Sequence, residues 1–289
     1  MKKSILSALV VLGLAGSVAY VQAAPSANEA AFAAADAVFA TRDVGADAGL
    51  VNTLAARAAY QAIVNHGAKD ADLVRAVTGV ARTYYYQGEV ILGKTTDTEK
   101  KARKALFNDC WSKAVEQMSP AKTGTQEPAY YYFRATCMAH EAEVSSTLEN
   151  LLALPKLLAT FTDGFKAPGA DTFEGGGLGR VQAAVRGNVA AKGLPGGLFN
   201  PTAALTLIDT SINSQGEPLG ALFCENYYRK AITLALIPSR TPEAKALTAQ
   251  TITDFTGYLA DGTLLPESIR AETKHCVAEA QAQAFGASL

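Results

Sequence analysis

The chain has only three histidines and four cysteines, the usual ligands of zinc, and they are widely separated. Its three histidines are His66, His140 and His275, and none belongs to a His-x-x-x-His or Cys-x-x-Cys pattern. Such patterns place two metal ligands on one helix or turn. The sequence therefore gives a zinc site no local support, and we expect no bound metal and no cofactor.

Catalytic motifs are absent in the same way. His140-Glu141 matches half of a zinc-protease motif, but Val144 stands where the second histidine belongs. No Gly-x-Ser-x-Gly nucleophile turn occurs. We expect Glu141 and Glu143 to lie on a solvated helix face and the protein not to be an enzyme. A hydrolase with a site assembled from distant residues is the weaker alternative.

Two runs of consecutive aromatic residues are more informative, one at 84–86 and one at 130–133. Successive residues of a helix point in different directions, so at least one ring in each run must leave the apolar face. Rings that line a groove suit a small amphipathic ligand or a peptide. The alternative is that they fill space between helices. Our candidate binding residues here are Tyr85, Tyr86, Tyr131 and Tyr132.

A glycine-rich segment, residues 164–200, holds 10 of the 24 glycines and includes the run Glu174-Gly-Gly-Gly-Leu-Gly-Arg180. Glycines before a helix can expose backbone N–H groups to an anion. The run lacks the Lys-Ser or Lys-Thr of a P-loop and the preceding strand of a dinucleotide site. Close helix packing, with Arg180 paired to Glu174 or capping carbonyls, explains the run equally well. Glu174, Arg180 and Phe199 complete the candidate binding residues.

The N-terminus predicts export. Lys2 and Lys3 precede an apolar run that ends in Val21-Gln22-Ala23, typical of a secretory signal peptide cleaved after Ala23. A retained membrane anchor is the alternative, but the run is shorter than the roughly 20 residues that span a bilayer. Removing residues 1–23 leaves 266 residues with 24 basic and 27 acidic side chains, a net charge of −3. This charge argues against a nucleic-acid partner. We expect a periplasmic protein without a stable membrane anchor.

Export makes disulfides the natural state of the four cysteines. Thr96 to Glu99 forms a capping box that opens a helix to about Met118, and a Pro/Gly-bearing break precedes a second helix from Ala129. If these helices form an antiparallel hairpin about residue 123, Cys110 and Cys137 lie side by side. This predicts Cys110–Cys137 and, from the remaining cysteines, Cys224–Cys276. Four buried free thiols are the alternative.

The elements that must position these residues are amphipathic helices, because apolar residues recur at three- and four-residue spacing. We expect one domain, residues 24–289, with the glycine-rich segment inserted. Its fold class is all-α, a right-handed α-α superhelix of degenerate tetratricopeptide-like hairpins. An irregular all-α globule is the alternative. The expected helices are 30–41, 49–65, 72–92, 97–118, 129 to about 154, 156–161, 180–191, 202–213, 218–236, 243–259 and 266–285.

Part of the sequence resembles a known family. The runs Phe173 to Arg180, Gly193-Leu-Pro-Gly-Gly197 and Asn200-Pro-x-x-Ala204, with the aromatic stretch 128–137, are similar to the periplasmic T component of TRAP (tripartite ATP-independent periplasmic) transporters. The likeness extends from about Thr96 to Leu236. It implies an all-helical tetratricopeptide-like fold, no catalysis and a role beside a periplasmic substrate-binding protein, through a central pore or cleft.

These observations predict a non-enzymatic periplasmic helical-repeat protein for binding or scaffolding. Its partner is a periplasmic substrate-binding protein or a small hydrophobic or organic ligand, held between the aromatic runs and the glycine-rich segment. The alternative is a stand-alone carrier of a small hydrophobic ligand in an internal cavity. A homo-oligomer is compatible with both.

Overall fold

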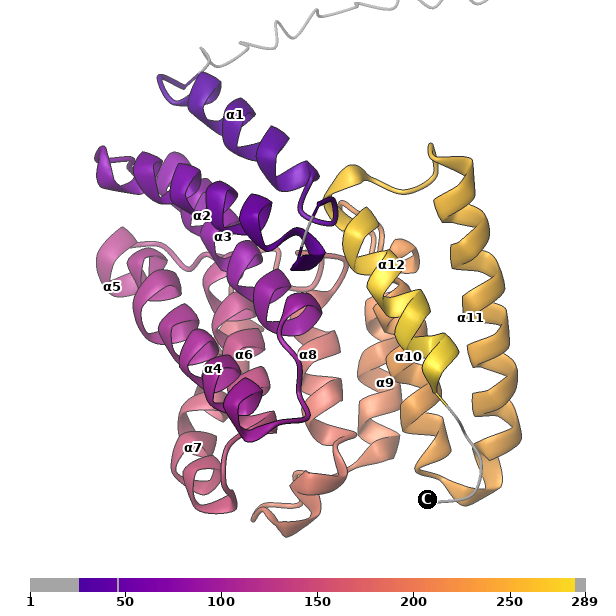
Figure 1. Cartoon of the computed structure of the whole chain (residues 1–289). Coiled ribbons are helices and arrows are strands. Elements are labelled where there is room, and N and C mark those ends of the chain that lie inside the picture. Colours follow the sequence, from indigo (N-terminus) through magenta and orange to yellow (C-terminus); the bar gives the residue numbers. More distant parts are fainter. Residues whose placement is uncertain (1–25, 46, 284–289) are drawn as a thin grey trace, which may run out of the picture.

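The computed structural model describes residues 26–45 and 47–283, and the regular secondary structure of this part of the chain is entirely helical (Figure 1). It contains twelve α-helical segments and no β-strand. The α-helices are α1 (Glu29–Ala40), α2 (Leu50–Asn65), α3 (Asp70–Tyr86), α4 (Asp97–Asp109), α5 (Pro120–Thr123), α6 (Pro128–Glu143), α7 (Thr147–Gly164), α8 (Gly177–Arg186), α9 (Pro201–Ile212), α10 (Cys224–Ala235), α11 (Thr241–Asp261) and α12 (Glu267–Ala282). The predicted all-α class is confirmed. The predicted signal peptide lies outside the described residues.

Short helical turns extend or connect these helices. Two are π-helical, η2 (Gln87–Ile91) after α3 and η3 (Cys110–Ala114) after α4. The 3-10 turns are η1 (Asp47–Gly49), η4 (Val115–Met118), η5 (Val189–Gly193), η6 (Gly220–Leu222) and η7 (Pro238–Arg240). Isolated π-helical turns are uncommon and often occur at functional sites. In this chain η2 carries Glu89, which becomes important below.

Two helix starts form as their sequences predict. The Thr96 hydroxyl accepts a hydrogen bond from the backbone N–H of Glu99 (3.2 Å), and the Glu99 carboxylate accepts one from the N–H of Thr96 (2.8 Å). The Asn200 side chain accepts from the N–H of Ala203 (2.9 Å) at the start of α9. These bonds satisfy N–H groups that a helix leaves unpaired at its first turn. The capping box and the Asn-Pro start are both confirmed.

Other boundaries were predicted wrongly. We expected one helix from Ala129 to about Leu154 with a restart at Pro155, but the break lies at residues 144–146 and α7 runs through Pro155. Ser146 and Glu149 form a second capping box, which fixes the start of α7 and which proline-based reasoning overlooked. The helix expected from residue 218 begins only at Cys224, because η6 precedes it.

The helices pack mainly against their neighbours in the chain, and the last helix, α12, lies beside the segment that follows the first helix, α1. Contacts run through α1, α2 and α3, through α4, α6 and α7, and through α8 to α12 in order. Figure 1 shows α12, in yellow, beside the indigo helices at the start of the described chain. Arg42, just after α1, donates from Nε to Glu272 of α12 (3.0 Å), and Lys274 forms an ion pair with Asp43. The right-handed, tetratricopeptide-like character of this array stays a prediction.

Both predicted cysteine pairs are confirmed. Cys110 and Cys137 are bonded and join η3 to α6 within the largest apolar cluster. Cys224 and Cys276 are bonded and join α10 to α12 within the C-terminal cluster. The described residues contain no free cysteine. Two disulfides are compatible with an exported protein.

The consecutive glycines of the glycine-rich segment allow close packing. A Cβ atom added to Gly175 would lie 2.4 Å from the Phe223 ring, and one added to Gly176 would lie 2.8 Å from the Cα of Ser211. Both residues also have positive φ angles, 56° and 73°, which favour glycine. Of the two explanations for the glycines, the structure therefore supports packing. Across the described helices, none is both long and apolar enough to cross a membrane.

Candidate functional site

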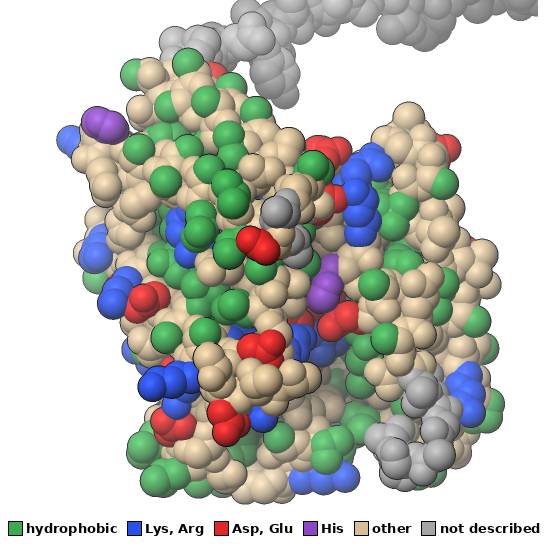
Figure 2. All heavy atoms as spheres, viewed as in Figure 1, with side chains coloured by type: hydrophobic (Ala, Val, Ile, Leu, Met, Phe, Trp, Pro, Cys, Tyr) green, Lys and Arg blue, Asp and Glu red, His purple; other side chains and the backbone are tan. Residues whose placement is uncertain are grey.

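A cleft lies between the N-terminal helices and the C-terminal helices α10 and α12; we call it the central cleft. The space available inside it is about 70 Å³, and the whole hollow, open solvent included, is about 770 Å³. Figure 2 shows acidic, basic and histidine side chains in the hollow between the two sides of the molecule. Its ionisable and aromatic lining residues are Arg82, Tyr85, Glu89, Tyr132, Phe133, Glu174, Arg180, Phe223, Glu225, Arg229, Glu272, His275 and Glu279.

The lining has an excess of negative charge. Five glutamates face three arginines, which gives a net charge of −2 when His275 is neutral. Lys94 adds a positive charge at the edge, with Nζ 2.6 Å from Glu89 Oε1 and 3.6 Å from Glu279 Oε1. A cleft with this many ionised groups favours charged ligands, because burying them under an apolar one would leave charges without partners.

The Arg180 side chain is buried and bound to other parts of the protein. It is 3% exposed, and Nη1 donates to the Asn226 side chain (3.1 Å) while Nη2 donates to the Glu174 carbonyl (3.2 Å). Its guanidinium also lies 4.5 Å from the centre of the Phe223 ring. The Glu174 carboxylate pairs instead with Arg82 of α3 (Nε to Oε1, 3.1 Å). Arg180 thus joins α8 to α10 and caps a carbonyl, which is the packing role weighed from the sequence.

Arg229 of α10 differs because its side chain is 24% exposed and only weakly bound. Its Nε lies 3.4 Å from Glu225 Oε1. Among the described residues, neither terminal nitrogen of Arg229 makes a hydrogen bond within this distance. Burial lowers its pKa, but Glu225 and Glu143 raise the pKa further, so the group stays charged. Arg229 therefore offers a permanent cation and up to four N–H donors to the cleft.

A buried charge cluster, formed by Glu89, Arg103, His140 and Glu143, supports the cleft from behind. Arg103 is completely buried and donates to the Gly88 carbonyl, to Glu89 and to Glu143 (3.1 Å). His140 Nδ1 lies 3.2 Å from carboxylate oxygens of both Glu89 and Glu143. Glu143 is exposed, as expected of a solvated helix face, but the expectation is incomplete, because its carboxylate also binds Arg103 of α4 and lies beside His140 of its own helix.

Glu141 also has hydrogen-bond partners within the protein. Its carboxylate accepts hydrogen bonds from the Trp111 ring nitrogen and from the Asn108 side chain (3.2 Å). It therefore links α6 to α4 and η3, and the solvated-face expectation is wrong for this residue.

We expect the free energy of unfolding to be greatest between about pH 4.5 and 6.5. Burial lowers the pKa of His140, but Glu143 and Glu89 raise it above the ordinary 6.5, so its contribution is lost as pH rises through the folded pKa. Burial raises the pKa of Glu279, but His275 and Lys94 lower it from 4.5 to about 2. Its contribution is lost as pH falls through that value. Urea denaturation at a series of pH values measures this dependence.

Replacing His140 by Gln should flatten the alkaline limb of this pH profile, whereas replacing the exposed His66 by Gln should not change it. Stability that stays constant from pH 5 to 9 in the unmodified chain would contradict the assignment.

Four of the seven sequence-predicted site residues line the central cleft: Tyr85, Tyr132, Glu174 and Arg180. Tyr85 and Tyr132 come from α3 and α6, and the two runs do meet across the cleft. Burial raises the pKa of Tyr85 well above its ordinary value, and burial raises that of Tyr132 to about 12. Both phenols are therefore neutral hydrogen-bonding groups at physiological pH.

The other three predicted residues do not line this cleft. Tyr86 is 2% exposed and lies near the Arg42 guanidinium, 5.5 Å from its ring centre. Tyr131 belongs to the main apolar core, whereas the next residue, Tyr132, lines the cleft. Phe199 packs with a separate cluster around Leu154 and Leu198. A helix turns by about 100° per residue, so the rings of one run point in different directions and not all of them can reach the cleft.

Sequence reasoning missed the charged residues that dominate the cleft: Arg82, Glu89, Glu225, Arg229, Glu272, His275 and Glu279. They come from α3, η2, α10 and α12, which only the closure of the array brings together. One local signal was present. His275 and Glu279 are four residues apart, the spacing that places two side chains on one helix face.

We expect Arg180→Ala to lower the free energy of unfolding by about 2–3 kcal/mol, because it leaves the Asn226 side chain and the Glu174 carbonyl without a charged donor. Chemical denaturation measures the effect. Arg186→Ala, six residues beyond on the same helix but less buried, is the control and should cost much less. A stable Arg180→Ala protein that has lost ligand binding would favour the binding role instead.

The described chain is an all-helical protein in which residues of α3, η2, α6, α8, α10 and α12 line a charged cleft. Comparison with protein-family models, with curated proteins and with solved structures finds no match for this chain.

Proposed function

We propose that this chain is a non-enzymatic binding protein, whose central cleft holds a small zwitterionic organic ligand with a carboxylate and an ammonium group. The observation that carries the proposal is the state of Arg229. Its guanidinium is partly exposed in the cleft, and within the described structure its terminal nitrogens have no hydrogen-bond partner. A ligand carboxylate would accept two parallel hydrogen bonds from such a group.

The acidic lining supports the other half of this ligand class. Glu225, Glu272 and Glu279 are each only partly exposed and offer carboxylates to an ammonium group. The rings of Tyr85 and Phe223 add apolar area beside these charges. The same lining does not support the alternative of a hydrophobic-ligand carrier, because an apolar ligand would strip water from ionised groups and give nothing in return.

Two features of the cleft lining count against a cysteine nucleophile and a carboxylic general acid, and so favour binding over these two kinds of catalysis. Both lining cysteines are in a disulfide, so no thiol nucleophile is available. Burial raises the pKa of Glu89, but His140 and Arg103 lower it below its ordinary value, and the pKa of Glu279 is lowered as well. Both therefore stay ionised at neutral pH and cannot donate a proton as general acids.

Isothermal titration calorimetry with amino acids and dipeptides tests the ligand class, with dicarboxylates and polyamines, which carry charges of one sign only, for comparison. We expect a zwitterion to bind, and Arg229→Gln to weaken binding at least tenfold with little change in melting temperature. Arg240→Gln is the matched control, since Arg240 is an exposed arginine paired with Glu243 outside the cleft. Binding of polyamines alone, or equal binding by Arg229→Gln, would contradict the proposal.

We also propose, from the resemblance to TRAP T components, that the protein is periplasmic and contacts a substrate-binding protein. The α7 surface supports a protein partner, because Leu148 and Leu152 are 67% and 75% exposed on one side of that helix. Exposed apolar residues that cluster mark interaction surfaces. Co-purification from periplasm tests this, with Leu148→Glu/Leu152→Glu as the variant expected to lose the partner. Recovery of the chain from the cytoplasm with its leader intact would contradict export.

A further inference from the structure

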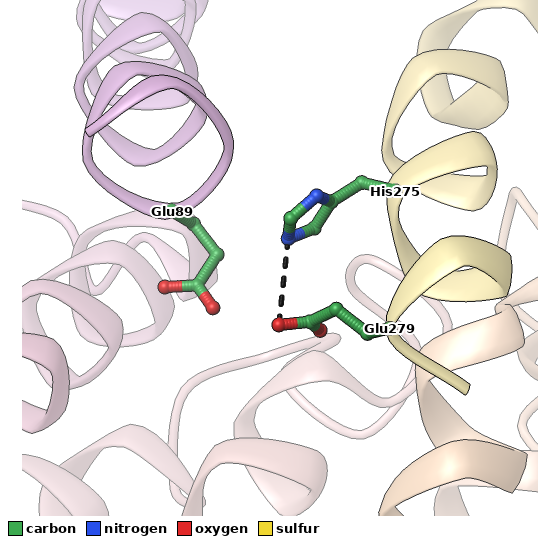
Figure 3. A group of neighbouring side chains, drawn as sticks. All are labelled: Glu89, His275 and Glu279. Carbon is green, nitrogen blue, oxygen red and sulfur yellow. Dashed lines mark ion pairs between the residues drawn. The ribbon is translucent and has the colours of Figure 1, made fainter. Parts of the chain in front are cut away.

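Three side chains from opposite ends of the described chain converge at one edge of the central cleft. Glu89 comes from the π-helical turn η2, and His275 and Glu279 come from α12 (Figure 3). One ligand atom from each residue lies within 4.8 Å of the other two. Because η2 and α12 are about 190 residues apart in the sequence, the arrangement exists only in the folded array.

The histidine lacks the partner that a buried ring nitrogen usually has. His275 Nε2 is inaccessible to solvent and makes no hydrogen bond within the described residues. Glu279 Oε1 lies 3.6 Å away, too far for a hydrogen bond, and Figure 3 shows the nitrogen facing the space between the two carboxylates. An unsatisfied buried polar atom costs about 1–3 kcal/mol and calls for an explanation.

A positive charge already occupies this place. The Lys94 ammonium contacts Glu89 and approaches Glu279, but its side chain is 42% exposed and sits on the loop after η2. An exposed lysine can withdraw into solvent without disturbing a helix. The second oxygen of Glu89 is held by Arg103, which fixes the direction of the carboxylate. Supporting bonds of this kind orient the ligands of metal sites.

We propose that Glu89, His275 and Glu279 form a divalent-cation site that takes Zn²⁺, with the ion replacing the Lys94 ammonium between η2 and α12. One imidazole nitrogen and two carboxylate oxygens are a donor set that zinc accepts, whereas magnesium and calcium prefer oxygen ligands alone. Three protein ligands leave at least one coordination position for water or for an anionic group in the cleft.

The ion would also fasten the array. Glu89 belongs to the N-terminal part and the other two ligands belong to the last helix, so metal binding joins the two sides that enclose the cleft. Arg229 and Lys94 oppose the ion by charge, which limits its affinity. The proposal stands without the proposed organic ligand, because its test needs only the metal.

The test is titration of the metal-stripped chain from residue 24 onward with Zn²⁺ against a chromophoric chelator. We expect one ion per chain, and at least a tenfold weaker affinity in His275→Gln and in Glu279→Gln. Lys94→Met should bind Zn²⁺ more tightly, since it removes the competing ammonium. His66→Gln, which changes an exposed histidine elsewhere, is the matched control and should bind as the unmodified chain does.

Each of the following results either supports or overturns the proposed zinc site. Anomalous X-ray scattering at the zinc edge should place the ion between η2 and α12, and Mg²⁺ should not displace it. No zinc binding at micromolar protein, or equal affinity in His275→Gln and the unmodified chain, overturns the proposal. Should His275→Gln fail to fold, the Lys94→Met affinity and the anomalous peak still decide, because neither changes a ligand.

Discussion

Replacing Arg103 by Met is expected to lower the free energy of unfolding by about 3–5 kcal/mol, the cost of breaking a buried ion pair from one side. Arg103 is completely buried and is bound to Glu89, Glu143 and a backbone carbonyl. The variant leaves Glu89, which is 5% exposed, with Lys94 as its remaining direct ion-pair partner besides His140. At roughly 2–4 °C per kcal/mol for a chain of this size, the melting temperature falls by about 10 °C.

Lys104→Met is the matched control for this prediction. Lys104 is the next residue of α4 and pairs with Glu149, but both side chains are substantially exposed. Exposed ion pairs contribute about 0–1 kcal/mol. Urea denaturation of both variants measures the difference. If Arg103→Met loses no more stability than Lys104→Met, the buried charge cluster does not hold the fold together.

A double variant separates two effects of Arg103→Met: the loss of the ion-pair attraction, and the cost of leaving the buried Glu89 carboxylate poorly compensated. Adding Glu89→Gln to Arg103→Met removes the buried carboxylate that the single variant leaves poorly compensated. We expect the double variant to be more stable than Arg103→Met alone, because neighbouring residues of one network are not additive. A further loss of stability would show that Glu89 is stabilised chiefly by Lys94 and His140.

The fold could be predicted from the sequence wherever its causes are local. The Thr96 capping box and the Asn200-Pro201 start satisfy N–H groups within one helical turn, so their sequences suffice to place α4 and α9. The Cys110–Cys137 pair followed from a hairpin of neighbouring helices. Pro155 misled because α7 begins at the Ser146 capping box, about two turns before the proline, and continues through it.

The site was less predictable because the residues that form it are distant in sequence. Arg42 and Glu272 meet across 230 residues, and no local pattern reports such a contact. The π-helical turn η2 adds to the difficulty, since it interrupts the helical periodicity just where Glu89 enters the cluster. The aromatic runs did point to the cleft, but only part of each run lines it: Tyr85 from the first, and Tyr132 and Phe133 from the second.

Removing either disulfide should destabilise the chain by several kcal/mol. Cys110–Cys137 closes 27 residues and Cys224–Cys276 closes 52. The entropy that each bond removes from the unfolded chain corresponds to roughly 3.5 and 4 kcal/mol respectively. Urea denaturation of Cys110→Ala/Cys137→Ala and of Cys224→Ala/Cys276→Ala measures both values. Equal stability of the unmodified chain with and without dithiothreitol would contradict this expectation.

The two pairs differ in what they hold, and this makes them a test of the site as well. Cys224 and Cys276 both line the central cleft and fasten α10 to α12, so their loss frees the helix that carries His275 and Glu279. Cys110 and Cys137 lie in the core of the other half. At temperatures where both variants stay folded, Zn²⁺ affinity should therefore fall in Cys224→Ala/Cys276→Ala and persist in Cys110→Ala/Cys137→Ala. An equal fall of Zn²⁺ affinity in both variants would mean that the site depends on the overall stability of the protein and not on the Cys224–Cys276 bond beside it.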